Sequence, residues 1–206
     1  TFALEKYMNV TISSGPIGKL FHYGTINLEK HQNNSISLAS ISRPQSYLKA
    51  IEKSINPAIH AFSEKPDISK IIGQDENEKL EFKSSLRFDH KIGAMKTIAA
   101  FLNSKGGYLV IGFNDMRQPL GIHHDYQTLQ RKDADGFENH FTQVFNSMIG
   151  PEFRHLVKLW FYEIEKFEAS VIQTLASSKP VYLKLNDSEH FYIRTGNIVS
   201  DLKFSE

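Results

Sequence analysis

The sequence of 206 residues predicts an α+β fold, in which a mixed sheet packs against two main helices and follows a small strand-rich segment with a terminal helix. Two long stretches repeat apolar residues with the helical period of about 3.6. Several shorter stretches alternate apolar and polar residues, or run apolar between glycines, as is typical of strands. The pair Gly106-Gly107 separates a helical stretch from an apolar run, which indicates a strand–helix–strand unit.

Residues 1–56 read as a strand-rich segment followed by a helix. Alternating stretches predict strands at 7–12, 24–28 and 36–41, and Pro44 opens a helix that carries apolar residues as far as Ile55. The order resembles the second half of a bacterial pleckstrin-homology-like domain, on the stretch 17–26, Ile41 and Arg43-Pro44. The first strands of that fold have no counterpart after Thr1: either they lie upstream, or the resemblance is false.

Residues 57–75 are expected to be a linker. The stretch contains Pro57, Pro66 and Gly73 and has weak periodicity, with one short helix expected around 68–72. The second domain is therefore placed at 76–206.

The second domain supplies the sheet and the two main helices. Apolar residues at helical spacing predict helices at 91–104 and 135–150. Strands are expected at 80–83, 108–113, 156–164, 169–175, 181–185 and 191–193. His123-His124-Asp125 is interpreted as a surface loop, and Arg194-Thr-Gly-Asn197 as a tight turn.

Composition excludes several classes of protein. The net charge of +1 indicates no global attraction for nucleic acid, so a basic surface would have to be local. The absence of cysteine excludes disulfides and thiolate metal sites, and the apolar runs are too short to span a bilayer. The Walker A, nucleophile-elbow and His-Glu-x-x-His patterns are absent. A cytoplasmic location is expected, with membrane association through upstream sequence if the parent chain is longer.

Four motifs in order resemble the Schlafen-type Alba-like domain, the AlbA_2 group, over about residues 70–202. They are Glu76-x4-Glu81-Phe82-Lys83, then Ala100 to Gly112 with its Gly-Gly pair, Asp135-Gly-Phe137, and Pro180 to Lys184 leading to 191–197. The resemblance implies a nucleic-acid-binding (DNA or RNA) domain of the kind found in multidomain bacterial regulators, and it hints at a homodimer.

The same resemblance implies an alternative, a Mg²⁺- or Mn²⁺-dependent endonuclease, whose catalytic and metal-binding residues would be Glu76, Glu81 and Asp115. Carboxylates are suitable ligands for either ion, which could activate water at a phosphodiester. The spacing of Glu76 and Glu81 does not bring them together, so a bend near Asn77 would be required.

Six residues are candidates for contacting nucleic acid: Lys83, Arg87, Lys105, Gly106, Gly107 and Arg194. The basic ones could equally form an ordinary solvated face, the glycines could merely end a helix, and Arg194 could pair with a carboxylate. A third hypothesis assigns the chain no catalysis, and makes it a membrane- or protein-interaction module that acts through residues 1–55.

Overall fold

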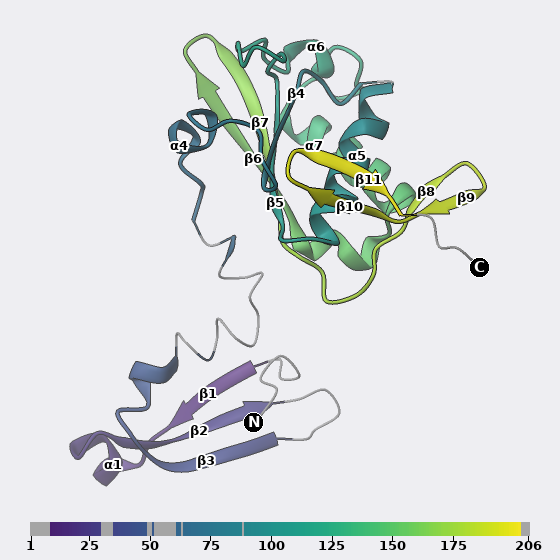
Figure 1. Cartoon of the computed structure of the whole chain (residues 1–206). Helices are drawn as coiled ribbons and strands as arrows, with labels where there is room; N and C mark the ends of the chain where they lie inside the picture. The colour runs from purple at the N-terminus through teal and green to yellow at the C-terminus, as the bar shows by residue number, and fades with distance from the viewer. Residues whose placement is uncertain are drawn as a thin grey trace. The chain divides into compact units, whose positions relative to one another are not determined.

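The structure, a computed structural model, describes residues 9–29, 35–48, 51, 61–62, 64–87 and 89–202. Its internal contacts divide the chain into an N-terminal unit, Thr1–Glu64, and a C-terminal unit, Lys65–Glu206 (Figure 1). The expected linker, 57–75, thus contributes residues to both units.

The N-terminal unit contains a three-stranded antiparallel sheet in the order β1-β2-β3. The strands are β1 (Asn9–Ser13), β2 (Tyr23–Glu29) and β3 (Ser35–Ser42), and α1 (Pro16–Leu20) connects the first two. Val10, Ile26 and Leu28 form its small core. Helix α1 was not predicted, although a proline at its first position suits the first turn of a helix. Of the expected terminal helix, residues 45–48 and 51 are helical, and the rest lies outside the described residues.

A four-stranded mixed sheet, ordered β4-β5-β7-β6, forms the centre of the C-terminal unit. Its strands are β4 (Leu80–Lys83), β5 (Gly107–Ile111), β6 (Val157–Ile164) and β7 (Phe167–Thr174). Strand β4 pairs parallel with β5, and the other two pairings are antiparallel. The prediction of a mixed sheet is confirmed. Helix α5 (Asp89–Leu102) makes the crossover that a parallel pair needs.

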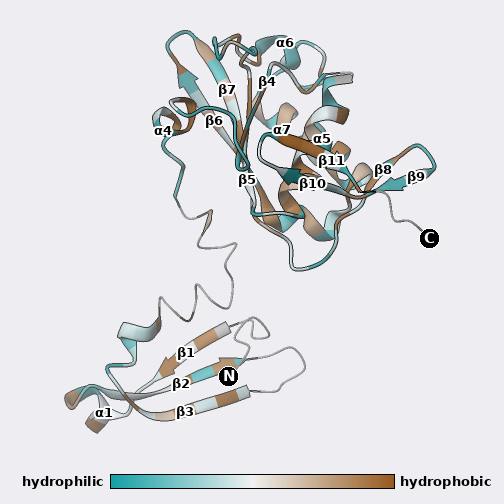
Figure 2. Ribbon diagram, in the orientation of Figure 1, coloured by the Kyte–Doolittle hydropathy of each residue, from teal (hydrophilic) through white to brown (hydrophobic). Residues whose placement is uncertain are grey.

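Buried apolar residues form two clusters, one on each face of this sheet. Figure 2 shows the hydropathy of each residue along the ribbon. On one face, α5 and α7 (Ala134–Met148) contribute a core that includes Met95, Ile98, Phe141 and Phe145. On the other, the short helix α4 (Ile68–Ile72) buries Ile71 beside Phe82 and Phe113. The two main helices and the expected short helix are therefore present.

The remaining elements are short. They are α6 (His123–Tyr126), the 3-10 helix η2 (Pro151–Leu156), and two hairpins: β8 (Leu183–Leu185) with β9 (Ser188–His190), and β10 (Tyr192–Thr195) with β11 (Ile198–Asp201).

One local interpretation was wrong, because Asp125 is buried in helix α6 rather than exposed in a loop. The predicted turn is present at Gly196-Asn197, between β10 and β11, but Arg194 itself belongs to β10. Within the described ranges, every helix is too short or too polar to cross a bilayer.

Candidate functional site

The chain bends sharply before β4, at the place where the carboxylate spacing required it. Asn77 and Leu80 exchange two backbone hydrogen bonds, of 3.1 and 3.4 Å, and the Asn77 side chain accepts the amide of Lys79 at 2.8 Å. The bend turns Glu76 back toward the strand, where its Oε1 accepts the amide N–H of Phe82 at 2.9 Å. Glu76 therefore lies beside the strand that carries Glu81.

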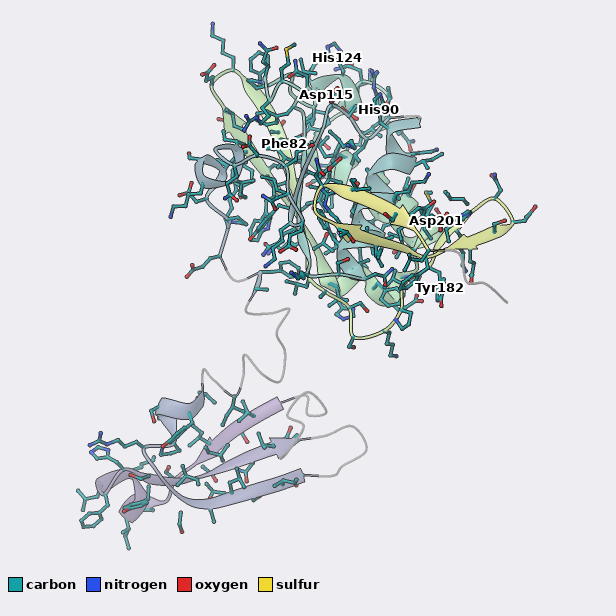
Figure 3. The ribbon with its side chains drawn as sticks, in the orientation of Figure 1. Phe82, His90, Asp115, His124, Tyr182 and Asp201 are labelled. Atoms are coloured by element: carbon teal, nitrogen blue, oxygen red, sulfur yellow. The ribbon has the colours of Figure 1, made fainter. Side chains whose placement is uncertain are left out.

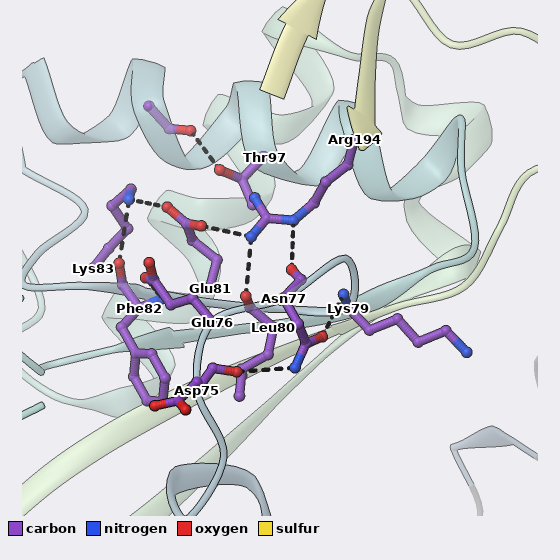
Figure 4. A network of polar contacts seen from close by, with 11 residues as sticks. Asp75, Glu76, Asn77, Lys79, Leu80, Glu81, Phe82, Lys83, Thr97 and Arg194 are labelled. Atoms are coloured by element: carbon purple, nitrogen blue, oxygen red, sulfur yellow. Dashed lines mark hydrogen bonds and ion pairs between the residues drawn. The ribbon is translucent and has the colours of Figure 1, made fainter. Parts of the chain in front are cut away.

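Glu81 and Arg194 form a buried ion pair at the start of β4 (Figure 4). One guanidinium nitrogen, Nη2, donates to Glu81 Oε2 at 2.8 Å and to the carbonyl oxygen of Leu80 at 3.0 Å. Nε donates to the carbonyl oxygen of Asn77 at 2.9 Å, and the guanidinium lies 5.2 Å from the ring centre of Phe101. Arg194 thus crosslinks β10 to the bend, which is the structural role that was weighed against phosphate contact.

Lys83 completes this network from the same strand. Its ammonium group contacts Glu81 Oε1 and donates to the carbonyl oxygen of Phe82 at 3.2 Å. Glu81 consequently has a cation on each of its carboxylate oxygens. The positive charges of Lys83 and Arg194 are thereby directed to a carboxylate within the domain.

The three predicted metal ligands do not form one site. Asp115 lies in an exposed turn beyond the end of β5 (Figure 3), whereas Glu76 and Glu81 lie at β4. In the part of the chain that the structure describes, no group of three histidine, aspartate or glutamate side chains could hold a metal ion. Glu81 is instead paired with two cations, Lys83 and Arg194.

Neighbouring backbone packs closely against the buried Gly-Gly pair. Lys105 forms an exposed ion pair of 2.9 Å with Glu78, which holds the pKa of that carboxyl below its ordinary value. Gly106 has a φ of +71°, and a Cβ there would lie 2.5 Å from the carbonyl oxygen of Thr174. A Cβ on Gly107 would lie 2.7 Å from that of Lys79. Both glycines are buried, so they allow β5 to pack closely rather than let a phosphate approach.

A separate hollow of about 690 Å³ gathers basic and amide side chains. Arg87 reaches it from the segment that leads into α5, Lys91 from the first turn of α5, and Arg131 from the loop before α7. Helix α7 contributes Asn139 and Gln143. Of the six predicted nucleic-acid contacts, only Arg87 lines this hollow.

The buried side chain of Asp125 positions one wall of the hollow. Its Oδ1 accepts the hydroxyl of Ser85 at 2.7 Å and the amide of Leu86 at 2.9 Å. These bonds tie the segment that carries Arg87 to helix α6.

Arg131 is paired with two carboxylates, one just before α7 and one in its first turn. It pairs with Asp133 at 2.7 Å and with Asp135 at 2.5 Å. The amide of Gly136 and this guanidinium together hold the pKa of Asp133 below its ordinary value.

Sequence reasoning missed most of this hollow. Asn139 and Gln143 are four residues apart, so they share the face of α7 opposite its apolar stripe, and that spacing was a usable signal. Arg131 carried no comparable signal, since it becomes part of the wall only through the fold of the loop.

Comparisons with known proteins identify the family of the chain. The family model described as "Schlafen, AlbA_2" matches residues 76–203. The chain belongs to the Schlafen AlbA_2 family. The bend, β4, the Gly-Gly pair and Arg194 all lie inside this AlbA_2 domain.

Individual relatives cover less of the chain. An uncharacterised ATP-binding protein of Ureaplasma parvum serovar 3 is 33% identical over 78 residues, which are 36% of this chain and 22% of that protein. The chain therefore spans less than a quarter of that relative.

Two solved structures are similar to the chain as well. The DIP2311 protein of Corynebacterium diphtheriae has 13% identity and a TM-score of 0.47, over 66% of this chain and 25% of that one. The N-terminal domain of a DNA helicase RecG-related protein of Nitrosomonas europaea has 20% identity and a TM-score of 0.44, over 68% of this chain and 88% of that one.

Proposed function

We propose that the AlbA_2 domain binds nucleic acid through phosphate contacts in the hollow between α5, α6 and α7. The observation that carries the proposal is that Arg87, Lys91 and Arg131 line one concave surface although they come from separate segments. Clustered lysine and arginine are what phosphate neutralisation requires. With a net charge of only +1 on the chain, such a cluster has to be local.

The shape and remaining side chains of the hollow support the same proposal. A volume of about 690 Å³ lies within the range of roughly 300–1,000 Å³ that small-ligand sites occupy, which suits a nucleotide or a short strand segment. Amides such as Asn139 and Gln143 can donate to phosphate or contact base edges. Asp125 keeps the Arg87 segment in place, so little ordering would be needed on binding.

The metal-dependent nuclease is a second candidate with less support. The family resemblance favours it, but the carboxylates at β4 are engaged by Lys83, Arg194 and the amide of Phe82. The name of the Ureaplasma relative refers to ATP binding, and the absence of a Walker A pattern gives that activity no support here.

Binding to labelled single-stranded and duplex DNA and RNA, with Mn²⁺ or with EDTA, tests both candidates. The double variant R87A/K91A should bind about tenfold more weakly than the unchanged protein, because two phosphate contacts are removed. Its matched control is K166A/K179A, which removes the same charge from exposed positions outside the hollow.

An equal loss in both double variants would contradict a site in the hollow, since it would reflect net charge alone. Cleavage that requires Mn²⁺ and is abolished by E81Q would establish the nuclease in place of a pure binding domain. A substrate that stays intact but is bound would support the binding domain.

A further inference from the structure

One end of the N-terminal unit exposes an unusual number of large apolar side chains. On α1 and just after it, Ile17, Leu20 and Phe21 are 76%, 73% and 63% exposed. Tyr23, at the start of β2, and Tyr47 are 49% and 52% exposed. Scattered apolar residues are normal on a surface, but a contiguous group marks an interaction site.

The backbone holds these side chains outward. A Cβ on Gly18 would lie 2.6 Å from the carbonyl oxygen of Tyr23, so α1 lies with its glycine against β2. His22 and Arg43 both have left-handed backbone conformations, with φ of 56° and 47°. The amide of Arg43 donates to the carbonyl oxygen of His22 at 2.6 Å, which joins the two. Such conformations persist only where the surroundings enforce them, and they cluster at functional sites.

Positive charge accompanies the apolar side chains. A hollow of about 360 Å³ at the same end is lined by Lys19, His22 and Arg43, together with Gln45. Residues 9–28 and 35–48 contain no aspartate or glutamate. Glu29 lies at the far end of β2, away from α1. The α1 end is therefore apolar and basic with no acidic residue in its own segments.

We propose that the α1 end of the N-terminal unit binds the surface of an anionic lipid bilayer. Ile17, Leu20 and Phe21 enter the interfacial region, and Lys19 and Arg43 contact the lipid phosphates. A bilayer surface offers both an apolar layer and an anionic one, which is the combination that this end of the unit complements. A second copy of the chain fits less well, because a two-fold contact would place the same cations, Lys19 and Arg43, against each other.

Co-sedimentation of the full chain with vesicles tests this inference. We expect binding to phosphatidylcholine vesicles that contain phosphatidylserine, weaker binding to phosphatidylcholine alone, and a decline as salt is added. L20S should weaken binding about tenfold, because a mostly exposed leucine could then no longer enter the bilayer. K19A and R43A should each weaken it roughly fivefold. The matched control is I198S, which removes a side chain that is 63% exposed on β11.

Three outcomes would overturn the inference. One is no binding to either kind of vesicle, and another is an equal loss in L20S and I198S. The third is that the protein binds no vesicles but forms a dimer, detected by light scattering, that L20S abolishes. That result would identify a second copy of the chain as the occupant. The affinity of L20S for nucleic acid should be unchanged. A failure of the membrane proposal can therefore be distinguished from a failure of the proposal for the AlbA_2 hollow.

Discussion

Arg194 and Arg87 belong to the same domain and were both candidates for phosphate contact, yet the fold gives them different surroundings. The Arg194 side chain is fully buried and donates to Glu81, Leu80 and Asn77. Arg87 is half-buried and lines an open hollow beside the exposed Lys91. The comparison teaches that the position supplied by the fold, rather than residue type, separates an arginine that crosslinks the interior from one that lies at a hollow.

The largest effect is expected at the buried arginine. R194M removes the partner of Glu81 and leaves two backbone carbonyls without their donor, so it should lower the free energy of unfolding by about 3–5 kcal/mol. Urea denaturation of the full chain measures the change in the transition that unfolds the C-terminal unit. R117M is the matched control, because Arg117 also pairs with a carboxylate, Asp75 at 2.9 Å, but on an exposed surface. That pair should contribute about 0–1 kcal/mol. Similar losses in the two variants would contradict the assigned role of Arg194.

The next effect concerns the Gly-Gly pair. Close packing, rather than the approach of a ligand, explains why glycine is needed there. G106A puts a side chain at a φ of +71°, with its Cβ 2.5 Å from a backbone oxygen. Strain of this kind costs about 1–3 kcal/mol, and the contact adds to it. G93A, inside α5, should instead stabilise by about 0.5–1 kcal/mol, because a Cβ there meets nothing within 4 Å. Thermal unfolding compares the two. A G106A protein that is fully stable but binds nucleic acid poorly would restore the phosphate interpretation.

The helices and the sheet strands could be predicted because the spacing of apolar residues that specifies each element lies within that element. The apolar stripe of α5 has the helical period, and glycines mark where the apolar run of β5 begins and ends, so each stretch indicates its own secondary structure. The required bend at Asn77 could also be anticipated, since strand geometry alone separates Glu76 from Glu81. The pairing of Glu81 with Arg194 joins residues 113 apart in sequence, and no local pattern records it. For the same reason Asp125 was interpreted as a loop residue, although it anchors Ser85 across 40 residues.

A smaller effect is expected at the hollow, and it should appear in binding rather than in stability. R87A/K91A should reduce the slope of log affinity against log salt by about two, because each lost phosphate contact removes close to one released counterion. Fluorescence anisotropy over a salt series measures the slope, while urea denaturation checks that the fold is retained. An unchanged slope would remove both residues from the interface.

The smallest effect concerns a buried hydroxyl that, like Arg194, holds the fold. Tyr162 donates to the carbonyl oxygen of Pro66 at 2.6 Å, which ties the segment before α4 to β6. Y162F should cost about 1 kcal/mol at neutral pH.

The dependence on pH distinguishes this hydroxyl from simple packing. Burial raises the pKa of Tyr162 from 10 to about 12. Because the folded state holds this proton more tightly than the unfolded state, its contribution is complete below pH 10 and is lost as the pH rises toward 12. Over that window the unchanged protein should lose more stability than Y162F, as urea midpoints at successive pH values would show. Parallel curves for the two proteins would mean that the hydroxyl ionises as freely in the fold as it does in water.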